Sequence, residues 1–276
     1  MPLPKQVIAI DWSGAEAKAA QRRGIRAAMC DVETGQVELR PGLLRSEVET
    51  WLAKLAKAGA PVVVGLDFSF SYPAWFLREL GCGSAPAFWA KVAEEGEQWL
   101  REPHPHLWGR RKGSGPPAMH RAPEWLGYRA CEREVFATKR LPISSFQIGG
   151  AGAVGTGTLR GMPMLARLRK AGWSVWPFDP PRLPMLLEIY PRSLTGPVVK
   201  SNAGERTRYL ARPQFAELRP EVRAEASVSE DAFDALVSAL AMREHAASFA
   251  QLRQAQDEQT RLEGAIWRPS RSKGQA

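Results

Sequence analysis

The sequence predicts an α/β fold in which helices flank one mixed sheet of five strands. Three observations predict it: short apolar runs of strand length, amphipathic helical stretches between them, and acidic residues at the ends of some of the runs. A chain of 276 residues, 44% of them hydrophobic, can bury a large core without disulfides. We therefore expect a single domain over 1–249 and a polar C-terminal tail over 250–276, which starts with a frayed helix and continues as a loose segment.

The first four strands are expected before residue 70. Residues 7–11 (VIAID) form a short apolar run, and after a polar turn IRAAMCDV and QVELR predict two strands joined like a hairpin through Glu33-Thr34-Gly35. From Leu44 to Ala58 apolar residues recur with a 3.6-residue period, which predicts an amphipathic helix closed by Gly59. The run PVVVGLDF, which contains Asp67, predicts a strand buried on both faces.

Residues 71–160 interrupt this order and predict a large insertion after the fourth strand. The region is rich in Trp, Pro and Gly, and we expect helices at about 86–100 and 123–138. Regular alternation then resumes with a helix at 160–171, the runs WSVWPF and PMLLEIYP, and a final helix at 230–247.

The composition indicates a basic protein of a reducing compartment. The net charge of +9 favours acidic partners, nucleic acid first among them. Three cysteines without CxxC spacing argue against a disulfide framework or a zinc site. The apolar runs are too short for a signal peptide or a membrane span. We expect a cytoplasmic protein without a membrane partner, and the sequence does not indicate its oligomeric state.

Acidic residues stand where strand ends and one helix face are expected to meet. Asp11 ends the first strand, Asp67 the fourth, Glu188 lies in the fifth, and Asp231 and Asp234 share a face of the last helix. Carboxylates brought so close repel each other unless a divalent cation such as Mg²⁺ or Mn²⁺ compensates. Two such ions can activate a water and stabilise the leaving oxygen in phosphodiester hydrolysis.

Each of these acids also has a purely structural interpretation. Asp11 can form a turn and Asp67 can cap one, while Glu188 can pair with Arg192. Asp231 is the better candidate for an acid that simply favours the positive N-terminal end of the helix. The acids would form no metal site only if all of these structural interpretations were correct at once. This favours the metal-binding hypothesis.

Four motifs carry a resemblance to a known family. IDWSG at 10–14, GLDFSF at 65–70, EIYP at 188–191 and DAFDALVSALA at 231–241 resemble the predicted nuclease family catalogued as domain of unknown function 429. That family is assigned to the ribonuclease H-like superfamily, and the similarity runs from about residue 7 to 245. EIYP together with DAFDAL is the more specific part of the match.

The resemblance implies a ribonuclease H-like five-stranded sheet and a metal-dependent nuclease acting on DNA or RNA with Mg²⁺ or Mn²⁺. Asp11 corresponds to the central metal ligand, which bridges the metals, and Asp67 to the acid after the fourth strand. Asp231 or Asp234 completes the set, with Asp234 taken as the metal ligand. Glu188 belongs to the matching EIYP motif. We include it among the catalytic candidates, although the resemblance implies no defined role for it at the metal site.

Segment 101–140 is the expected substrate-binding region. It holds nine Lys or Arg and four Glu, a balance of 9 − 4 = +5, interleaved with aromatic residues. Basic charge follows a phosphate backbone and aromatic faces stack on unpaired bases. The residues expected to bind substrate are Trp108, Arg110, Arg111, Lys112, Arg121 and Arg129. The alternative is that the aromatics pack the insertion and the charges form a solvated face.

Two further motifs admit weaker interpretations. Gly150, Gly152 and Gly155 form a GxGxxG, but its position in the middle of the chain argues against a dinucleotide site. The glycines either lead into a helix starting near Thr158, whose N-terminal amides can hold a phosphate, or form a flexible loop. His104 and His106 can reach a metal together, although a structural loop is the simpler interpretation.

Two other functions remain open at this point. One is a non-catalytic nucleic-acid-binding protein with the same fold. The other is a phosphotransferase of the actin and sugar-kinase type, which usually requires a duplicated domain for which 276 residues leave no room.

Overall fold

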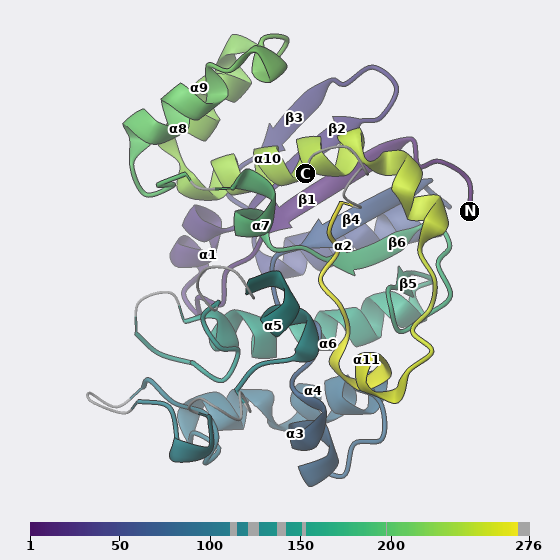
Figure 1. Ribbon diagram of the computed structural model, residues 1–276, viewed down its shortest axis with the longest axis vertical. Helices are drawn as coiled ribbons and strands as arrows, with labels where there is room; N and C mark the ends of the chain where they lie inside the picture. Colours follow the sequence, from purple (N-terminus) through teal and green to yellow (C-terminus); the bar gives the residue numbers. More distant parts are fainter. Residues whose placement is uncertain (111–114, 121–126, 137–141, 151–152, 197, 270–276) are drawn as a thin grey trace. The chain divides into compact units, whose positions relative to one another are not determined.

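The computed structural model describes residues 1–110, 115–120, 127–136, 142–150, 153–196 and 198–269 (Figure 1). The chain divides into two compact units. The first comprises Met1–Asp67 and Pro181–Leu252 together with the chain from Trp267 onward, and the second comprises Phe68–Pro180 and Arg253–Ile266.

The fold is α/β with a mixed sheet and flanking helices, as the sequence predicts. The sheet has six assigned strands rather than the five expected. The additional one, β5 (Ser174–Val175), has two residues and belongs to the second unit. So short a strand has no period that a sequence pattern can reveal.

Five strands of the sheet belong to the first unit, in the order β3-β2-β1-β4-β6. They are β1 (Gln6–Asp11), β2 (Arg26–Asp31), β3 (Val37–Arg40), β4 (Val62–Leu66) and β6 (Met185–Glu188). β2 runs antiparallel to β1 and β3, whereas β4 runs parallel to both β1 and β6. Four of these strands were predicted within two residues of their bounds, whereas the run PMLLEIYP extends three residues beyond the end of β6.

The central strands are buried on both faces, as their continuous apolar runs predict. Val7–Ile10 of β1 are fully buried, and every residue of β4 is buried. The predicted hairpin between β2 and β3 is also present. Asp31 Oδ1 accepts hydrogen bonds from the backbone N–H of Thr34 at 2.7 Å and from its hydroxyl at 2.9 Å, and Gly35 takes φ +74°.

Six α-helices of the first unit are described. They are α1 (Lys18–Gly24), α2 (Arg45–Lys57), α7 (Pro191–Thr195), α8 (Ala203–Leu210), α9 (Pro220–Val228) and α10 (Glu230–Glu244). α10 lies across β1 and β2, and α2 lies behind the strands in Figure 1. α2 and α10 match the expected helices, but the segment expected to be a polar turn after β1 contains α1.

Gly65 allows α10 to approach β4 closely. A Cβ at this position would lie 2.7 Å from Ile189 Cγ2 and 2.9 Å from Met242 Sδ, both too close for a real side chain. Met242 belongs to α10, so the side-chain position of Gly65 points toward the face of the sheet that α10 covers. This fixes which residues of β4 face the helix, because side chains alternate along a strand.

The second unit is mainly helical in its described residues. Its α-helices are α3 (Ala74–Glu79), α4 (Ala85–Arg101), α5 (Ala130–Phe136), α6 (Val154–Lys170) and α11 (Glu258–Glu263). α4 packs against α6, and the helix predicted at 86–100 corresponds to α4. Of the helix predicted at 123–138, the structure places α5; residues 123–126 and 137–138 lie outside the described ranges.

The C-terminal segment contains a helix, as expected, but this helix is capped and the residues after it are partly buried. Asp257 caps α11 by accepting a hydrogen bond from the backbone N–H of Thr260 at 2.7 Å. Leu262, Glu263 and Trp267 are buried. A few apolar residues separated by many charged ones do not produce a clear apolar face, so the sequence did not predict that this segment is buried. Across the described ranges, no helix combines the length and apolarity that crossing a membrane requires.

Candidate active site

Asp11 and Asp67 leave adjacent parallel strands at the same edge of the sheet. Ile10 pairs with Leu66 in the register of β1 and β4, and the backbone N–H of Asp67 donates a hydrogen bond to the Ile10 carbonyl at 3.1 Å. Asp67 follows Gly65 by two residues, so strand alternation directs Asp67, and Asp11 beside it, toward the face covered by α10.

The start of α10 brings two further acids to this face. Ser229 caps the helix by accepting a hydrogen bond from the backbone N–H of Ala232 at 3.1 Å. Asp231 lies in the first turn and is partly exposed, while Asp234 lies one turn later and is buried. Asp231 is therefore placed to interact favourably with the helix dipole, as its structural interpretation proposed.

The four aspartates form one electrostatically coupled cluster. Burial raises the pKa of Asp11 well above its ordinary value, and the charges of Asp67, Asp234 and Asp231 raise it further. Burial, followed by the charge of Asp234, raises the pKa of Asp67 to about 8. Burial raises the pKa of Asp234 to about 6 and also raises that of Asp231. The structure thus brings together the acids that the sequence singled out on two strands and one helix.

Glu188 is close to this cluster but is directed differently. It pairs with Leu66 in the register of β4 and β6, so alternation assigns it to the face opposite Asp67. The side chain is buried, and the Glu188 carbonyl accepts a hydrogen bond from the Trp267 N–H at 2.8 Å. Its charge is the smallest of the causes that act on the pKa of Asp67. Glu188 is therefore a neighbour of the cluster rather than a member of the face that α10 covers.

Lys200 is a member of the cluster that the sequence analysis did not identify. Its ammonium donates a hydrogen bond to Asp234 Oδ2, and its charge lowers the pKa of all four aspartates. Asp234 Oδ1 is buried and has no hydrogen-bond partner among the described residues. Lys200 lies between α7 and α8 in a segment without helical or strand period, so no pattern distinguishes it from other lysines.

The cluster is not a preformed metal-binding group. Within the part of the chain that the structure describes, no three or more His, Cys, Asp or Glu residues are arranged to hold a metal ion. Lys200 is instead the cation in direct contact with Asp234.

Only part of the expected substrate-binding region can be placed. Arg110 is exposed, and the backbone N–H of Trp108 donates a hydrogen bond to the Phe146 carbonyl at 3.0 Å while its side chain is partly buried. Arg111, Lys112 and Arg121 lie outside the described residues.

The position of Arg129 does not fit the substrate-binding role that we expected. Its side chain is fully buried, and its guanidinium donates hydrogen bonds to Glu132 Oε1 and to the Glu263 carbonyl, each at 3.0 Å. The Glu263 carboxylate accepts from the backbone N–H groups of Ala130 and Ala74, at 2.6 and 2.9 Å. This internal network binds the segments of the second unit to one another and presents no charge to a ligand.

The glycine-rich motif also has a structural role. α6 begins at Val154, before the start expected near Thr158, and Gly155 lies inside it. A Cβ at Gly155 would lie 2.2 Å from the Ser145 carbonyl oxygen, and the Gly155 N–H donates a hydrogen bond to the Gln147 carbonyl at 2.9 Å. The glycine allows close packing and its amide is used internally, which argues against the phosphate site. Gly152 lies outside the described residues.

The histidines of segment 104–106 pack within the second unit. His106 Nε2 lies 2.9 Å from Glu79 Oε1, and the rings of His104 and His106 are 5.3 Å apart, each packed edge-on to Phe76. This arrangement favours the structural loop that the sequence analysis preferred over a metal site.

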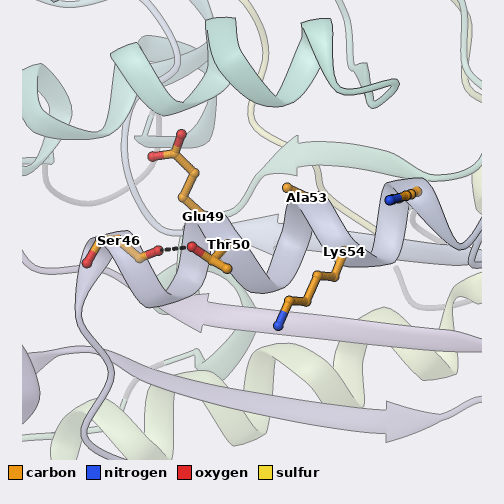
Figure 2. A pocket seen from close by; sticks show the side chains of 6 residues that line it. Ser46, Glu49, Thr50, Ala53 and Lys54 are labelled. Atoms are coloured by element: carbon orange, nitrogen blue, oxygen red, sulfur yellow. Dashed lines mark hydrogen bonds between the residues drawn. The ribbon is translucent and has the colours of Figure 1, made fainter.

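A surface hollow lies along one face of α2 (Figure 2). Its lining residues are Ser46, Glu49, Thr50, Ala53, Lys54 and Lys57. The Thr50 hydroxyl donates a hydrogen bond to the Ser46 carbonyl at 2.8 Å within the helix. None of the clustered acids lines this hollow, so it adds nothing to the candidate site.

No family model, curated protein or solved structure matches this chain. What the aspartate cluster does is therefore inferred from its own chemistry.

Proposed function

We propose that this protein is a divalent-metal-dependent nuclease of the ribonuclease H-like type, which hydrolyses phosphodiester bonds in DNA or RNA. One observation carries the proposal: Asp11, Asp67 and Asp234 reach one face of the sheet from two parallel strands and a covering helix, and their charges act on one another. An acid on the first strand, an acid after the fourth and an acid on the last helix are the set that the family resemblance implies.

The chemistry of the cluster fits a divalent cation of the Mg²⁺ or Mn²⁺ type. Carboxylate oxygens are the ligands that these hard cations prefer. Asp234 Oδ1 is buried and has no hydrogen-bond partner among the described residues. Burying charged oxygens without compensation is costly, so the cluster favours an additional positive charge.

Asp11, Asp67 and Asp234 are the residues that would hold such an ion. When bound, it would supply an activated water and stabilise developing negative charge on the phosphate oxygens. The residues of the chain hold three carboxylates in fixed relative positions, because β1 and β4 are paired along their length and α10 packs against the sheet. The burial of Asp11 and Asp234 limits access of bulk water, which strengthens electrostatic interactions at the site.

Nucleic acid is the substrate that the charge of the chain favours. The net charge of +9 attracts a polyanion, and the exposed Arg110 is a described residue from the expected binding segment. The basic residues of such a protein can attract a phosphate backbone, while the acidic cluster attracts the cations that reduce its own repulsion of the phosphates.

Cleavage assays on single- and double-stranded DNA and RNA, with Mg²⁺ or Mn²⁺, test the proposal. We expect metal-dependent cleavage that Asp11→Asn reduces by about 100-fold or more, because loss of metal-assisted charge stabilisation costs several kcal/mol in the transition state. Glu33→Gln, a change in the exposed turn between β2 and β3, serves as the control and should cleave like the wild type.

Two outcomes would contradict the proposal. One is a wild-type protein that cleaves none of the four substrates in either metal, and the other is undiminished cleavage by a folded Asp11→Asn variant. Tight, salt-dependent nucleic-acid binding without any turnover would select the non-catalytic binding protein instead.

A further inference from the structure

Lys200 occupies a defined position against the aspartate cluster. Its side chain is 15% exposed and contacts Asp234 Oδ2, whose side chain is 8% exposed. Among the described residues, it is the cation whose charge acts on all four aspartates, whereas Arg26 and Arg206 act on Asp231. Lys200 therefore neutralises the cluster as a whole and not one acid alone.

A buried arginine fixes the backbone of Lys200. Arg206 is 4% exposed, and its guanidinium donates hydrogen bonds to the carbonyls of Lys200, Ser227 and Val228, the last two at 3.0 and 2.7 Å. Val228 directly precedes Ser229, the N-cap of α10. One guanidinium thus binds both the segment that carries Lys200 and the turn that leads into the helix that carries Asp234.

Binding a cation requires the aspartates to release the protons that their raised pKa values retain. With all four aspartates ionised and the ammonium of Lys200 beside them, the charges sum to −4 + 1 = −3. One divalent cation changes this to −1, whereas a second would change it to +1. Lys200 also uses Asp234 Oδ2, which leaves Oδ1 as the oxygen of that carboxylate without a partner.

We infer that Lys200 is the second cation of this site, so that the aspartates bind one divalent ion and the ammonium of Lys200 contacts the phosphate beside it. This inference rests on the proposed function. In it, Lys200 takes the place that a second metal ion occupies in sites where two ions flank the reacting phosphate. A lysine suits this role because its ammonium is a compact charge with three donors.

Calorimetric titration of the full chain with MnCl₂ tests the stoichiometry without any measurement of activity. We expect the wild type to bind one Mn²⁺ and Lys200→Arg, which keeps the charge, to do the same. Lys200→Met removes the charge while keeping an unbranched side chain that is one atom shorter. We expect this variant to bind the first Mn²⁺ at least about tenfold more tightly and to acquire a second, weaker site, because a repelling charge is lost.

The outcomes separate this inference from the proposed function. Two Mn²⁺ ions on the wild type, or a folded Lys200→Met variant with one ion at unchanged affinity, would overturn the role of Lys200 and leave the nuclease proposal standing. No Mn²⁺ binding by the wild type would overturn both. The wild-type stoichiometry decides the matter even if Lys200→Met does not fold, and circular dichroism establishes whether it does.

Discussion

The backbone N–H of Asp67 donates a hydrogen bond to the carbonyl of Ile10 at 3.1 Å, and this bond aligns Asp67 with Asp11 at the edge of two parallel strands. The alignment places the buried carboxyl group of Asp11 beside the partly buried one of Asp67, so ionising one disfavours ionising the other. A pairing of this kind makes the stability of the folded chain depend on pH in a defined direction.

Without divalent metal, the protein should lose stability as pH rises from about 4 to about 8. The pKa of Asp67 is about 8 in the folded chain, above the value of about 3.9 of an unfolded aspartate, so in this window the folded state binds more protons than the unfolded state. Each such group lowers the free energy of unfolding by up to about 1.4 kcal/mol per pH unit. Urea unfolding in EDTA across this range measures the slope.

The matching variant is Asp67→Asn, which cannot ionise. Its slope should be shallower than that of the wild type, while Glu33→Gln, in an exposed turn, should follow the wild type. A wild-type stability that increases with pH over the window, or equal slopes for all three proteins, would show that Asp67 does not titrate as its burial requires.

The guanidinium of Arg206 should contribute much more to stability than its neighbour on α8. Arg206→Ala removes the donor of three carbonyl groups and should lower the free energy of unfolding by about 3 kcal/mol. Arg208→Ala removes a side chain that is 73% exposed and paired with Glu205, and should cost less than about 1 kcal/mol. Denaturant unfolding of both variants gives the comparison, and equal losses would contradict the role of Arg206.

The sequence predicts much of the first unit because its elements are locally encoded. The apolar runs of β1 and β4 and the period of α10 are strong signals, and Asp11, Asp67 and Asp234 follow from where those elements end or turn. Pairing of the parallel strands β1 and β4 then brings Asp11 and Asp67 together, because the C-terminal ends of parallel strands lie at the same edge of the sheet.

The features that the sequence did not predict depend on contacts between residues far apart in the chain, which no local sequence pattern shows. Lys200 and Arg206 act through distant partners, Asp234 and the turn at Ser227, and neither stands in a motif. Arg129 was misjudged for the same reason: its sequence neighbours are basic and aromatic, but its carboxylate and carbonyl partners, Glu132 and Glu263, bury it. Charge along a sequence does not reveal which charged side chains face solvent.

Arg129 and Arg110 should therefore respond differently to replacement. Arg129→Ala leaves Glu132 buried without its cation and should cost about 3 to 5 kcal/mol in stability. Arg110→Ala should leave stability unchanged, since the side chain is exposed, but should weaken binding to a single-stranded oligonucleotide and reduce the salt slope by about one. Urea unfolding and fluorescence anisotropy at several salt concentrations measure the two effects, with exposed Lys18→Ala as the control. A stable Arg129→Ala variant would contradict the burial argument.

The contact of α10 with Gly65 should control both stability and the geometry of the aspartate cluster. An alanine Cβ would lie 2.7 Å from Ile189 Cγ2 and 2.9 Å from Met242 Sδ, so Gly65→Ala must displace β6 or α10 and should cost about 1 to 3 kcal/mol. Since α10 carries Asp234 and β4 leads to Asp67, the displacement should also weaken Mn²⁺ binding. Met242→Ala in the same chain removes the contact at Sδ and should restore part of the Mn²⁺ affinity, although truncating this buried side chain adds its own cost in stability. Gly83→Ala, where no atom lies within 4 Å of the new Cβ, should change neither quantity. Unfolding and Mn²⁺ titration of the four proteins test the argument, and a Gly65→Ala variant as stable as the wild type would refute the close approach.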